Sequence, residues 1–267
     1  MSTIFFGLLS WSSMFGLLDN PAWSALTTTQ AGFARGGGKA RRYAPGILPF
    51  AAFGKVGADA LADGGAFGED GADALADGGA LADGRAADLD VLIDAGEQFY
   101  VIGKLPALPA NWTLESELPC AQLLAPDDPG ALPRPVEGIE MLGPDDRDEM
   151  FALIDAVQPG YYLPGTRQLG EYFGIRRDGR LVAMAGERMR LTGFCEISAV
   201  CTSPDYTGNG YAQQLIGHLC RRHAAAGTFS FLHVSLANAR ALRLYEHLGF
   251  RHRRDISFFR VRKVAMH

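Results

Sequence analysis

The feature of this sequence that most constrains its fold is a strand, loop and helix pattern that ends near Ala226. An alternating, β-branched run from Ile197 to Thr202 meets a turn signal at residues 203–205, and a loop with Gly208 and Gly210 follows. Apolar residues then recur at helical spacing. The pattern predicts a strand that leads through a glycine loop into a helix.

Such a junction is suited to binding phosphate. The first turn of a helix leaves backbone N–H groups unpaired and carries the positive end of the helix dipole. Gly208 and Gly210 let the backbone turn tightly and let an anion approach without meeting a Cβ atom. On this motif alone, an ordinary connection in which the glycines serve only the turn remains open.

A second motif follows the first. After Gly227, a strand-like run at Thr228–Ser235 leads to a helical segment in which Asn238 is placed as the N-cap and Gly249 as the stop. One face of this helix would carry Leu242, Tyr245 and Leu248. The two motifs together predict a repeated strand-to-helix unit in the second half of the chain.

The ordered pair SAVCTSPDYTGNGYAQQLI and SLANARALRLYEHLGF resembles the GNAT superfamily of acetyl-CoA-dependent N-acetyltransferases, over about residues 137–262. The resemblance implies an α/β fold with a mixed, mostly antiparallel sheet flanked by helices. It also implies that the glycine loop receives the pyrophosphate of coenzyme A and that the preceding strand end pairs with the pantetheine arm. The implied cofactor-binding residues are Val200, Cys201, Thr202, Thr207, Gly208, Asn209, Gly210, Tyr211, Ala212, Gln213 and Asn238.

One position departs from the family pattern. The loop of the family usually opens with Gln or Arg, whereas the matching residue here is Thr207. The loss of a cationic side chain should weaken phosphate binding, while the backbone amides remain.

Two residues are candidates for proton transfer. An amine with a pKa near about 10 must lose a proton before it attacks a thioester, and Glu196, on the polar face of its strand, could accept that proton. A phenol with a pKa of about 10 can donate a proton at neutral pH, and the resemblance places Tyr245 beside the coenzyme sulfur. Solvation or ion pairing of Glu196 and core packing of Tyr245 are the alternatives.

The aromatic loop around Tyr161 and Tyr162 follows a helix expected from about residue 146 to residue 157. In the resembled family, this segment lies near the acceptor substrate. Both tyrosines are therefore candidate substrate-binding residues, with aromatic packing as the alternative.

The first half of the chain differs from the second. Residues 1–136 carry 8 Lys or Arg against 16 Asp or Glu, whereas residues 137–267 carry 17 against 14. The ten residues GADALADGGA occur twice, at Gly57–Ala66 and Gly71–Ala80, which indicates an acidic insertion at about 55–85 rather than a solenoid. We expect a smaller, diverged α/β domain over 1–135 and the acetyltransferase domain over 136–267.

Further elements are expected from local patterns. Helices are predicted from Pro21 toward residue 33, with Asn20 as the cap, at 87–92 and at 166–172. Strands are predicted at 98–103, 121–125, 138–142, 173–177 and 181–190, and the last two form a hairpin with its turn at Asp178 and Gly179. A flexible basic loop is predicted at 35–42.

Several partners and cofactors are not expected. Four cysteines show no paired metal spacing, so no metal is predicted, and no basic cluster is dense enough to indicate nucleic acid. The apolar segment Ile4–Leu18 lacks a charged start and is too short to span a membrane, so a cytoplasmic protein is expected. That segment could contribute to a homodimer interface.

The sequence thus predicts an N-acetyltransferase that moves an acetyl group from acetyl-CoA to a primary amine of a small molecule or peptide by direct attack. The alternative is a non-catalytic coenzyme-A-binding regulatory or interaction module.

Overall fold

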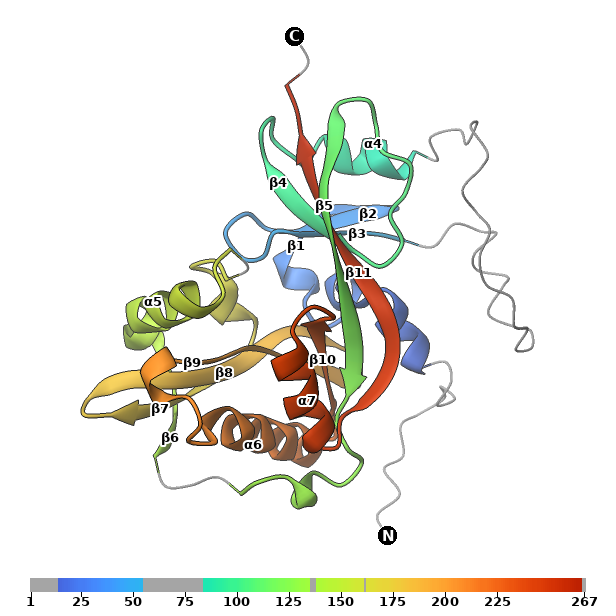
Figure 1. Cartoon of the computed structure of the whole chain (residues 1–267). Helices are drawn as coiled ribbons and strands as arrows, with labels where there is room; N and C mark the ends of the chain where they lie inside the picture. The colour runs from blue at the N-terminus through green and yellow to red at the C-terminus, as the bar shows by residue number, and fades with distance from the viewer. Residues whose placement is uncertain (1–13, 55–83, 135–137, 161, 266–267) are drawn as a thin grey trace.

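The computed structural model describes residues 14–54, 84–134, 138–160 and 162–265. In this part of the chain, eleven strands form one sheet in the order β1-β2-β3-β4-β11-β5-β10-β9-β8-β7-β6 (Figure 1). The strands are β1 Ala34–Gly37, β2 Ala40–Tyr43, β3 Phe50–Phe53, β4 Gln98–Ile102, β5 Trp112–Leu124, β6 Ile139–Met141, β7 Tyr172–Arg177, β8 Arg180–Leu191, β9 Phe194–Thr202, β10 Phe229–Ser235 and β11 Arg251–Lys263. Only β3 with β4 and β9 with β10 pair in parallel, so the expected mixed, mostly antiparallel sheet is confirmed.

Helices lie on both faces of the sheet. They are α2 Pro21–Thr27, α4 Arg85–Asp90, α5 Arg147–Val157, α6 Tyr211–Ala225 and α7 Ala239–His247. α4 lies against β1 and β2, and α5 and α6 lie against β8 and β9. Leu215 and Leu219 of α6 pack with Val182 of β8, whereas Met150 of α5 packs with Met184 of the same strand. Because residues two apart on a strand share a face, α5 and α6 would meet the same side if the strand were regular. They lie on opposite faces (Figure 1), because Val182 is an extra residue of β8 between Leu181 and Ala183, which pair with consecutive residues of β7. None of the described helices is long and apolar enough to cross a membrane.

The two longest strands cross the whole molecule. β5 and β11 run side by side from the α4 end to the α6 end (Figure 1) and pair along their length, with Ile256 opposite Cys120. β11 also pairs with β4. This strand from the second half of the chain therefore lies between β4 and β5, which both come from the first half. The division at residue 135 stays a prediction, and the sheet runs across it.

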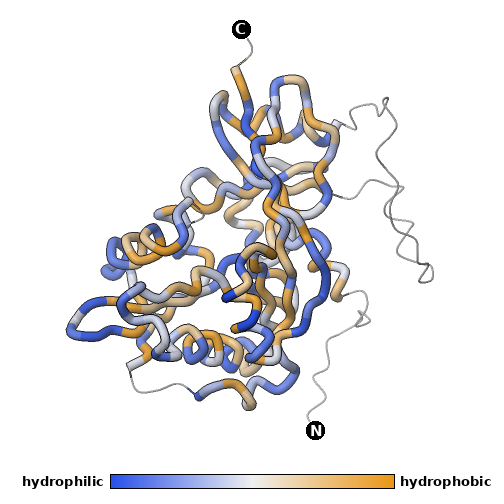
Figure 2. Tube along the Cα trace, in the orientation of Figure 1, coloured by the Kyte–Doolittle hydropathy of each residue, from blue (hydrophilic) through white to orange (hydrophobic). Residues whose placement is uncertain are grey.

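β11 is buried on both faces of the sheet. Ile256 and Phe258 are buried in one core cluster, and Val261, on the other face, in another. Further along the face of Ile256 and Phe258, Arg260 and Arg262 form ion pairs with Glu115 of β5. In Figure 2 hydrophobic residues likewise run along the strands, whereas the turn between β7 and β8 is hydrophilic.

Several expected elements are confirmed. Asn20 caps α2 by accepting a hydrogen bond from the backbone N–H of Trp23, and α5 occupies nearly the expected range. β7 and β8 form the expected hairpin, in which both turn residues, Asp178 and Gly179, have positive φ.

Other expected elements are wrong. Residues 34–43 form the β1–β2 hairpin rather than a flexible loop, because β2 pairs with β3 and the buried Arg42 binds Glu97. The helix expected over 166–172 is a short 3₁₀ turn at Thr166–Leu169, since the chain enters β7 at Tyr172. The strand expected at 121–125 begins much earlier, at Trp112, because β11 pairs along all of β5.

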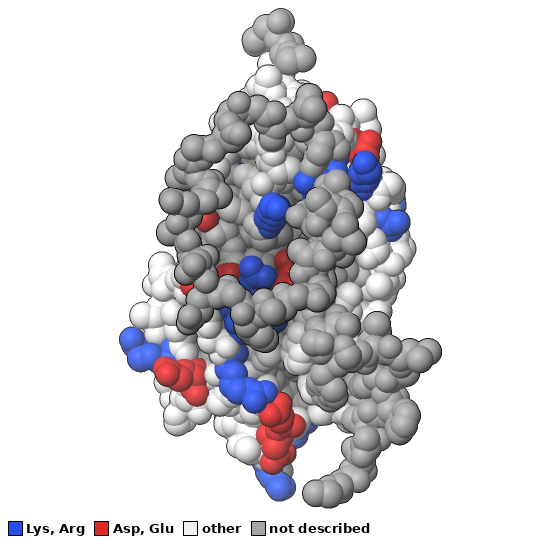
Figure 3. All heavy atoms as spheres, turned by 90° about the vertical axis from the view of Figure 1, so that its right-hand side faces the viewer, with Lys and Arg blue, Asp and Glu red and all other residues white. Residues whose placement is uncertain are grey.

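Three features of the sequence lie outside the described residues: the repeated decapeptide, most of the apolar amino-terminal segment, and Tyr161. On the face of the described part that Figure 3 draws, basic side chains lie beside acidic ones, as on an ordinary solvated surface.

Candidate functional site

The central feature of the site is the separation of two parallel strands. β9 and β10 pair at only three positions, which end at Glu196 opposite Phe231. Beyond this point β9 continues beside β8, and β10 continues beside β5 as far as Ser235. The facing backbone edges of β9 and β10 therefore open into a wedge. Along it, no strand among the described residues pairs with their N–H and C=O groups, so an extended ligand can do so.

A β-bulge lies at the mouth of this wedge. Ala199 has a φ of 51°, and the pairing with β8 shifts by one residue between Ser198 and Cys201. The expected strict alternation along β9 is therefore wrong beyond Ser198. Val200 packs with the core cluster of α6 and α7, and Cys201 is buried in the cluster of α5. Ser198 and Ala199 consequently lie next to each other in the wall of one pocket.

The glycine loop leads from β9 into α6 as expected. Gly208 and Gly210 both have positive φ, and Gly210 is the N-cap of α6 without a side-chain cap. The side chains of Thr207 and Asn209 donate hydrogen bonds to backbone oxygens within the loop, over 3.1 and 2.9 Å. The first N–H groups of α6, at Tyr211, Ala212 and Gln213, thus remain available for an anion.

A positive charge from another strand lies at this end of α6. The guanidinium of Arg177, at the end of β7, stacks over the ring of Tyr211 at 5.0 Å from its centre. Thr207 carries no charge. Arg177 therefore supplies, near the start of α6, the cation that the glycine loop lacks.

The two helices of the motifs also position side chains. Asn238 caps α7, since its side chain accepts a hydrogen bond from the backbone N–H of Ala241 over 3.0 Å. Tyr245 is buried against Phe250, with ring centres 5.5 Å apart. Burial raises the pKa of the Tyr245 phenol well above its usual value, so the group keeps its proton at neutral pH.

A pocket of about 610 Å³, part of it open to solvent, lies where the wedge meets the α5 side of the sheet. β10 contributes His233 and Ser235 to its wall, β9 contributes Ser198 and Ala199, and β8 contributes Arg188. The remaining described lining residues come from β5, β11 and the segment from α5 to the 3₁₀ turn: Leu118, Cys120, Phe258, Ile154, Gln158, Tyr162 and Thr166.

Glu196 lies beneath this pocket and is fully buried. Its carboxylate accepts two hydrogen bonds from Arg188, over 2.9 and 2.6 Å, and one from His233 Nδ1 over 2.7 Å. Burial acts to raise the pKa of Glu196, but the charge of Arg188 and the hydrogen bonds from Arg188 and His233 lower it to about 2. Glu196 is therefore ionised and engaged, and it contributes nothing to the pocket wall.

His233 has one hydrogen-bond partner at each of its ring nitrogens. Its Nδ1 faces the carboxylate of Glu196, while its Nε2 lies 3.0 Å from the amide nitrogen of Gln122, which can only donate. The proton therefore resides on Nδ1, and Nε2 accepts. Both ring nitrogens are used within the protein, so His233 orients Glu196 and shapes the pocket.

Tyr162 lines the pocket with its ring packed edge-on against Tyr172, at 5.8 Å. Its hydroxyl is buried and has no hydrogen-bond partner in the described part of the chain. Burial raises the pKa of Tyr162 to about 12. Tyr162 thus brings an unused O–H donor to the site.

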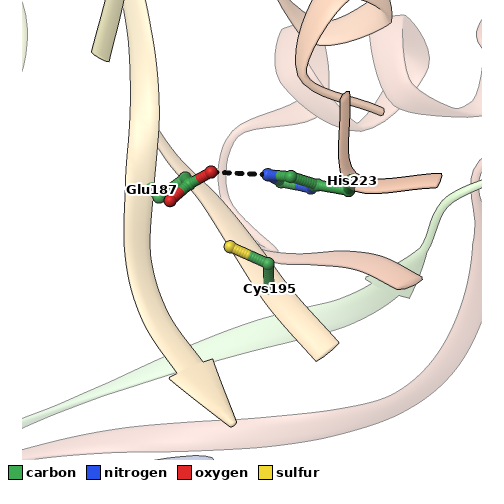
Figure 4. A group of neighbouring side chains, drawn as sticks. All are labelled: Glu187, Cys195 and His223. Carbon is green, nitrogen blue, oxygen red and sulfur yellow. Dashed lines mark hydrogen bonds and ion pairs between the residues drawn. The ribbon is translucent and has the colours of Figure 1, made fainter. Parts of the chain in front are cut away.

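A second buried cluster lies on the strands beside the site. Glu187, Cys195 and His223 point toward one another, and their ligand-type atoms lie within 4.8 Å (Figure 4). One carboxylate oxygen of Glu187 lies 3.0 Å from His223 Nε2, and the other accepts a hydrogen bond from Arg190 over 2.6 Å. His223 Nδ1 lies 2.7 Å from Ser230 Oγ. The ligand-type atoms of Glu187 and His223 are thus engaged in hydrogen bonds within the protein, and the positive charge of Arg190 disfavours a cation beside Glu187.

We accordingly expect a metal chelator to leave the thermal unfolding midpoint of the protein unchanged. The cluster satisfies its own polar groups, so no ion is required to balance them. Thermal unfolding of samples with and without the chelator measures this. A fall of the midpoint that added Zn²⁺ reverses would contradict the expectation.

Sequence reasoning missed two residues of the site, Arg188 and His233. Each reaches Glu196 from a neighbouring strand, and neither belongs to a recognisable local motif. The only available signal was that a buried carboxylate on a central strand needs cationic or donor partners from the strands beside it.

The chain resembles known proteins in sequence and in fold. Residues 172–259 match the family described as FR47-like protein. A solved structure from Novosphingobium aromaticivorans, assigned to the GNAT family of acetyltransferases, is 34% identical over 93% of this chain and 99% of its own, with a TM-score of 0.75. A GCN5-related N-acetyltransferase from Kribbella flavida shares the fold, at 14% identity over 92% of this chain and 93% of its own, with a TM-score of 0.52. No curated protein sequence matches.

Proposed function

Because the chain belongs to the GNAT family of acetyltransferases, we propose that it transfers the acetyl group of acetyl-CoA directly to a primary amine. The observation that carries this proposal is the wedge between β9 and β10, which leads to the uncapped start of α6. The wedge has the free backbone edges that an extended pantetheine arm needs. The helix start has the free N–H groups that a pyrophosphate needs.

In this proposal each part of the site has a task. The backbone of Val200, Cys201 and Thr202 pairs with the pantetheine arm, and Asn238 contacts that arm beside its capping role. The N–H groups of residues 208–213 hold the pyrophosphate, with Arg177 as the nearby cation.

Acetyl-CoA would supply an acetyl thioester whose carbon the amine attacks. A backbone N–H of Val200 or Cys201, next to the bulge, donates a hydrogen bond to the thioester oxygen and stabilises the negative charge that develops there. Tyr245 holds the proton that the departing thiolate takes. Glu196 positions Arg188 and His233 in the pocket wall. The amine loses one proton as the amide forms, and this proton passes through water to Glu196, which balances the proton that Tyr245 gives to the thiolate.

Two observations favour the alternative, a non-catalytic coenzyme-A-binding module. Thr207 replaces the usual cationic or amide side chain. The carboxylate that the described residues place beneath the pocket, Glu196, is already engaged. Such a module would bind acetyl-CoA and turn over no amine.

The first test is thermal unfolding across acetyl-CoA concentrations, with a Gly210→Asp variant beside the parent. Ligand at about 100 times its dissociation constant should add roughly 2.7 kcal/mol of stability to the parent. The variant should lose this gain, because it places a side chain and a negative charge at the proposed phosphate site. Gly210→Asn is the matched uncharged control, since Asn tolerates positive φ better than other side chains. No shift of the parent at millimolar acetyl-CoA would refute both functions.

A further inference from the structure

The acceptor pocket has no negative charge in its described wall. Its lining consists of apolar side chains, neutral polar groups and one cation, Arg188. The carboxylate of Glu196 lies beneath this wall and is neutralised by its own partners. An ammonium group that entered the pocket would lose its water shell and gain no opposite charge.

The pocket also offers hydrogen-bond donors that the protein leaves unused. Arg188 gives its Nε and Nη2 to Glu196, and no described residue accepts from its Nη1. Its guanidinium lies over the rings of Phe50 and Phe258, at 5.1 and 5.8 Å, which fixes its plane. Tyr162 adds its buried, unpartnered hydroxyl. An acceptor that fits this wall carries an oxygen, such as a carbonyl, close to its amine.

Apolar surface occupies the rest of the wall. Leu118, Ile154 and Phe258 line the pocket together with the buried thiol of Cys120. Burial of an apolar side chain against this surface favours binding.

Resting on the proposed function, we propose that the acceptor is the α-amino group of a peptide or amino-acid amide whose first side chain is apolar. This group combines an amine, a neighbouring carbonyl oxygen and an apolar side chain. At pH 7 roughly one in ten α-amino groups is uncharged, against about one in 2,500 lysine-type amines, as their usual pKa values of about 7.9 and 10.4 imply. A site without a carboxylate in its wall therefore accepts α-amino groups and rejects lysine-type amines.

The experiment compares two acceptors on the full chain with acetyl-CoA at pH 7. One is a short peptide with an amino-terminal leucine, and the other is a lysine blocked at its α-amino group. More basic amines are stronger nucleophiles, which offsets part of the difference in uncharged fraction, so we expect kcat/KM to favour the leucine peptide by at least about tenfold. Preference for the blocked lysine would overturn the inference.

A charge placed in the wall gives an independent test. Ser198 lines the pocket and is half-buried, so Ser198→Asp adds a carboxylate where the ammonium would lie, and Ser198→Asn is the matched neutral control. We expect the Asp variant to shift the ratio of kcat/KM toward the blocked lysine by about tenfold, and the Asn variant to leave it unchanged. An unchanged ratio in the Asp variant would contradict the inference.

The thermal shift with acetyl-CoA separates two kinds of failure. If acetyl-CoA does not stabilise the parent, the proposed function itself fails. If acetyl-CoA stabilises the parent but the leucine peptide is not acetylated, the inference about the acceptor is overturned while the binding site stands.

Discussion

Replacing Tyr245 by Phe should reduce kcat by about 10³-fold. The thiolate of coenzyme A is expelled when the new amide forms, and a positioned proton donor contributes typically 10²–10⁴-fold to such a step. Burial raises the pKa of Tyr245, so its phenol carries the proton throughout the neutral range. The ring that remains in Tyr245→Phe still packs against Phe250, which keeps the core intact.

Two measurements and one control variant test this prediction. The steady-state rate of the variant gives the loss of kcat, while thermal unfolding with acetyl-CoA shows whether binding is retained. Tyr206→Phe is the matched control and should keep nearly full activity. Tyr206 is partly buried and lies in the loop between β9 and α6. A kcat of Tyr245→Phe within about threefold of the parent would rule out the proton-donor role.

The local motifs predicted the frame of the site well. The glycines of the loop before α6, the cap at Asn238 and the turn at Asp178 are all short-range signals, because the residues that fix each of them lie within a few positions of one another. Family resemblance extended these signals to the sheet, whose mixed, mostly antiparallel character is confirmed.

What the sequence did not predict depends on contacts between distant segments. The bulge at Ala199 puts an alanine at positive φ, and nothing in its neighbours signals this, so the expected faces of Val200 and Cys201 were exchanged. β11 was missed because Arg, His and Asp dominate its first half. The partners of Arg253, for example, are Gln122 of β5 and Asp19, both far away in the sequence.

The ion pair beneath the pocket shows the same limit most clearly. Arg188 and Glu196 are eight residues apart on antiparallel neighbours, and only the irregular register of β8 and β9 brings their side chains together. A pattern of alternating residues cannot give that register, since each bulge reverses the faces beyond it.

Replacing Arg188 by Met should destabilise the protein by about 3–5 kcal/mol. The change removes one partner of a buried pair and leaves the carboxylate of Glu196 without a compensating charge. Chemical denaturation at pH 7 measures the loss. Adding Glu196→Gln to this variant should recover much of it, because the double variant buries no unpaired charge while His233 can still bond to the amide. A double variant less stable than Arg188→Met would contradict this account.

The pH dependence of stability provides the second half of this prediction. The pKa of Glu196 is about 2 in the folded protein, below its usual value of 4.5, so its contribution is fully present above about pH 4.5 and is lost as the pH falls toward 2. Glu196→Gln should therefore flatten the acid limb of the stability curve over this window. Asp205→Asn, at an exposed carboxylate of the loop before α6, is the control and should leave the acid limb unchanged. An equally steep acid limb in Glu196→Gln would show that other carboxylates, and not the pair beneath the pocket, cause the loss of stability in acid.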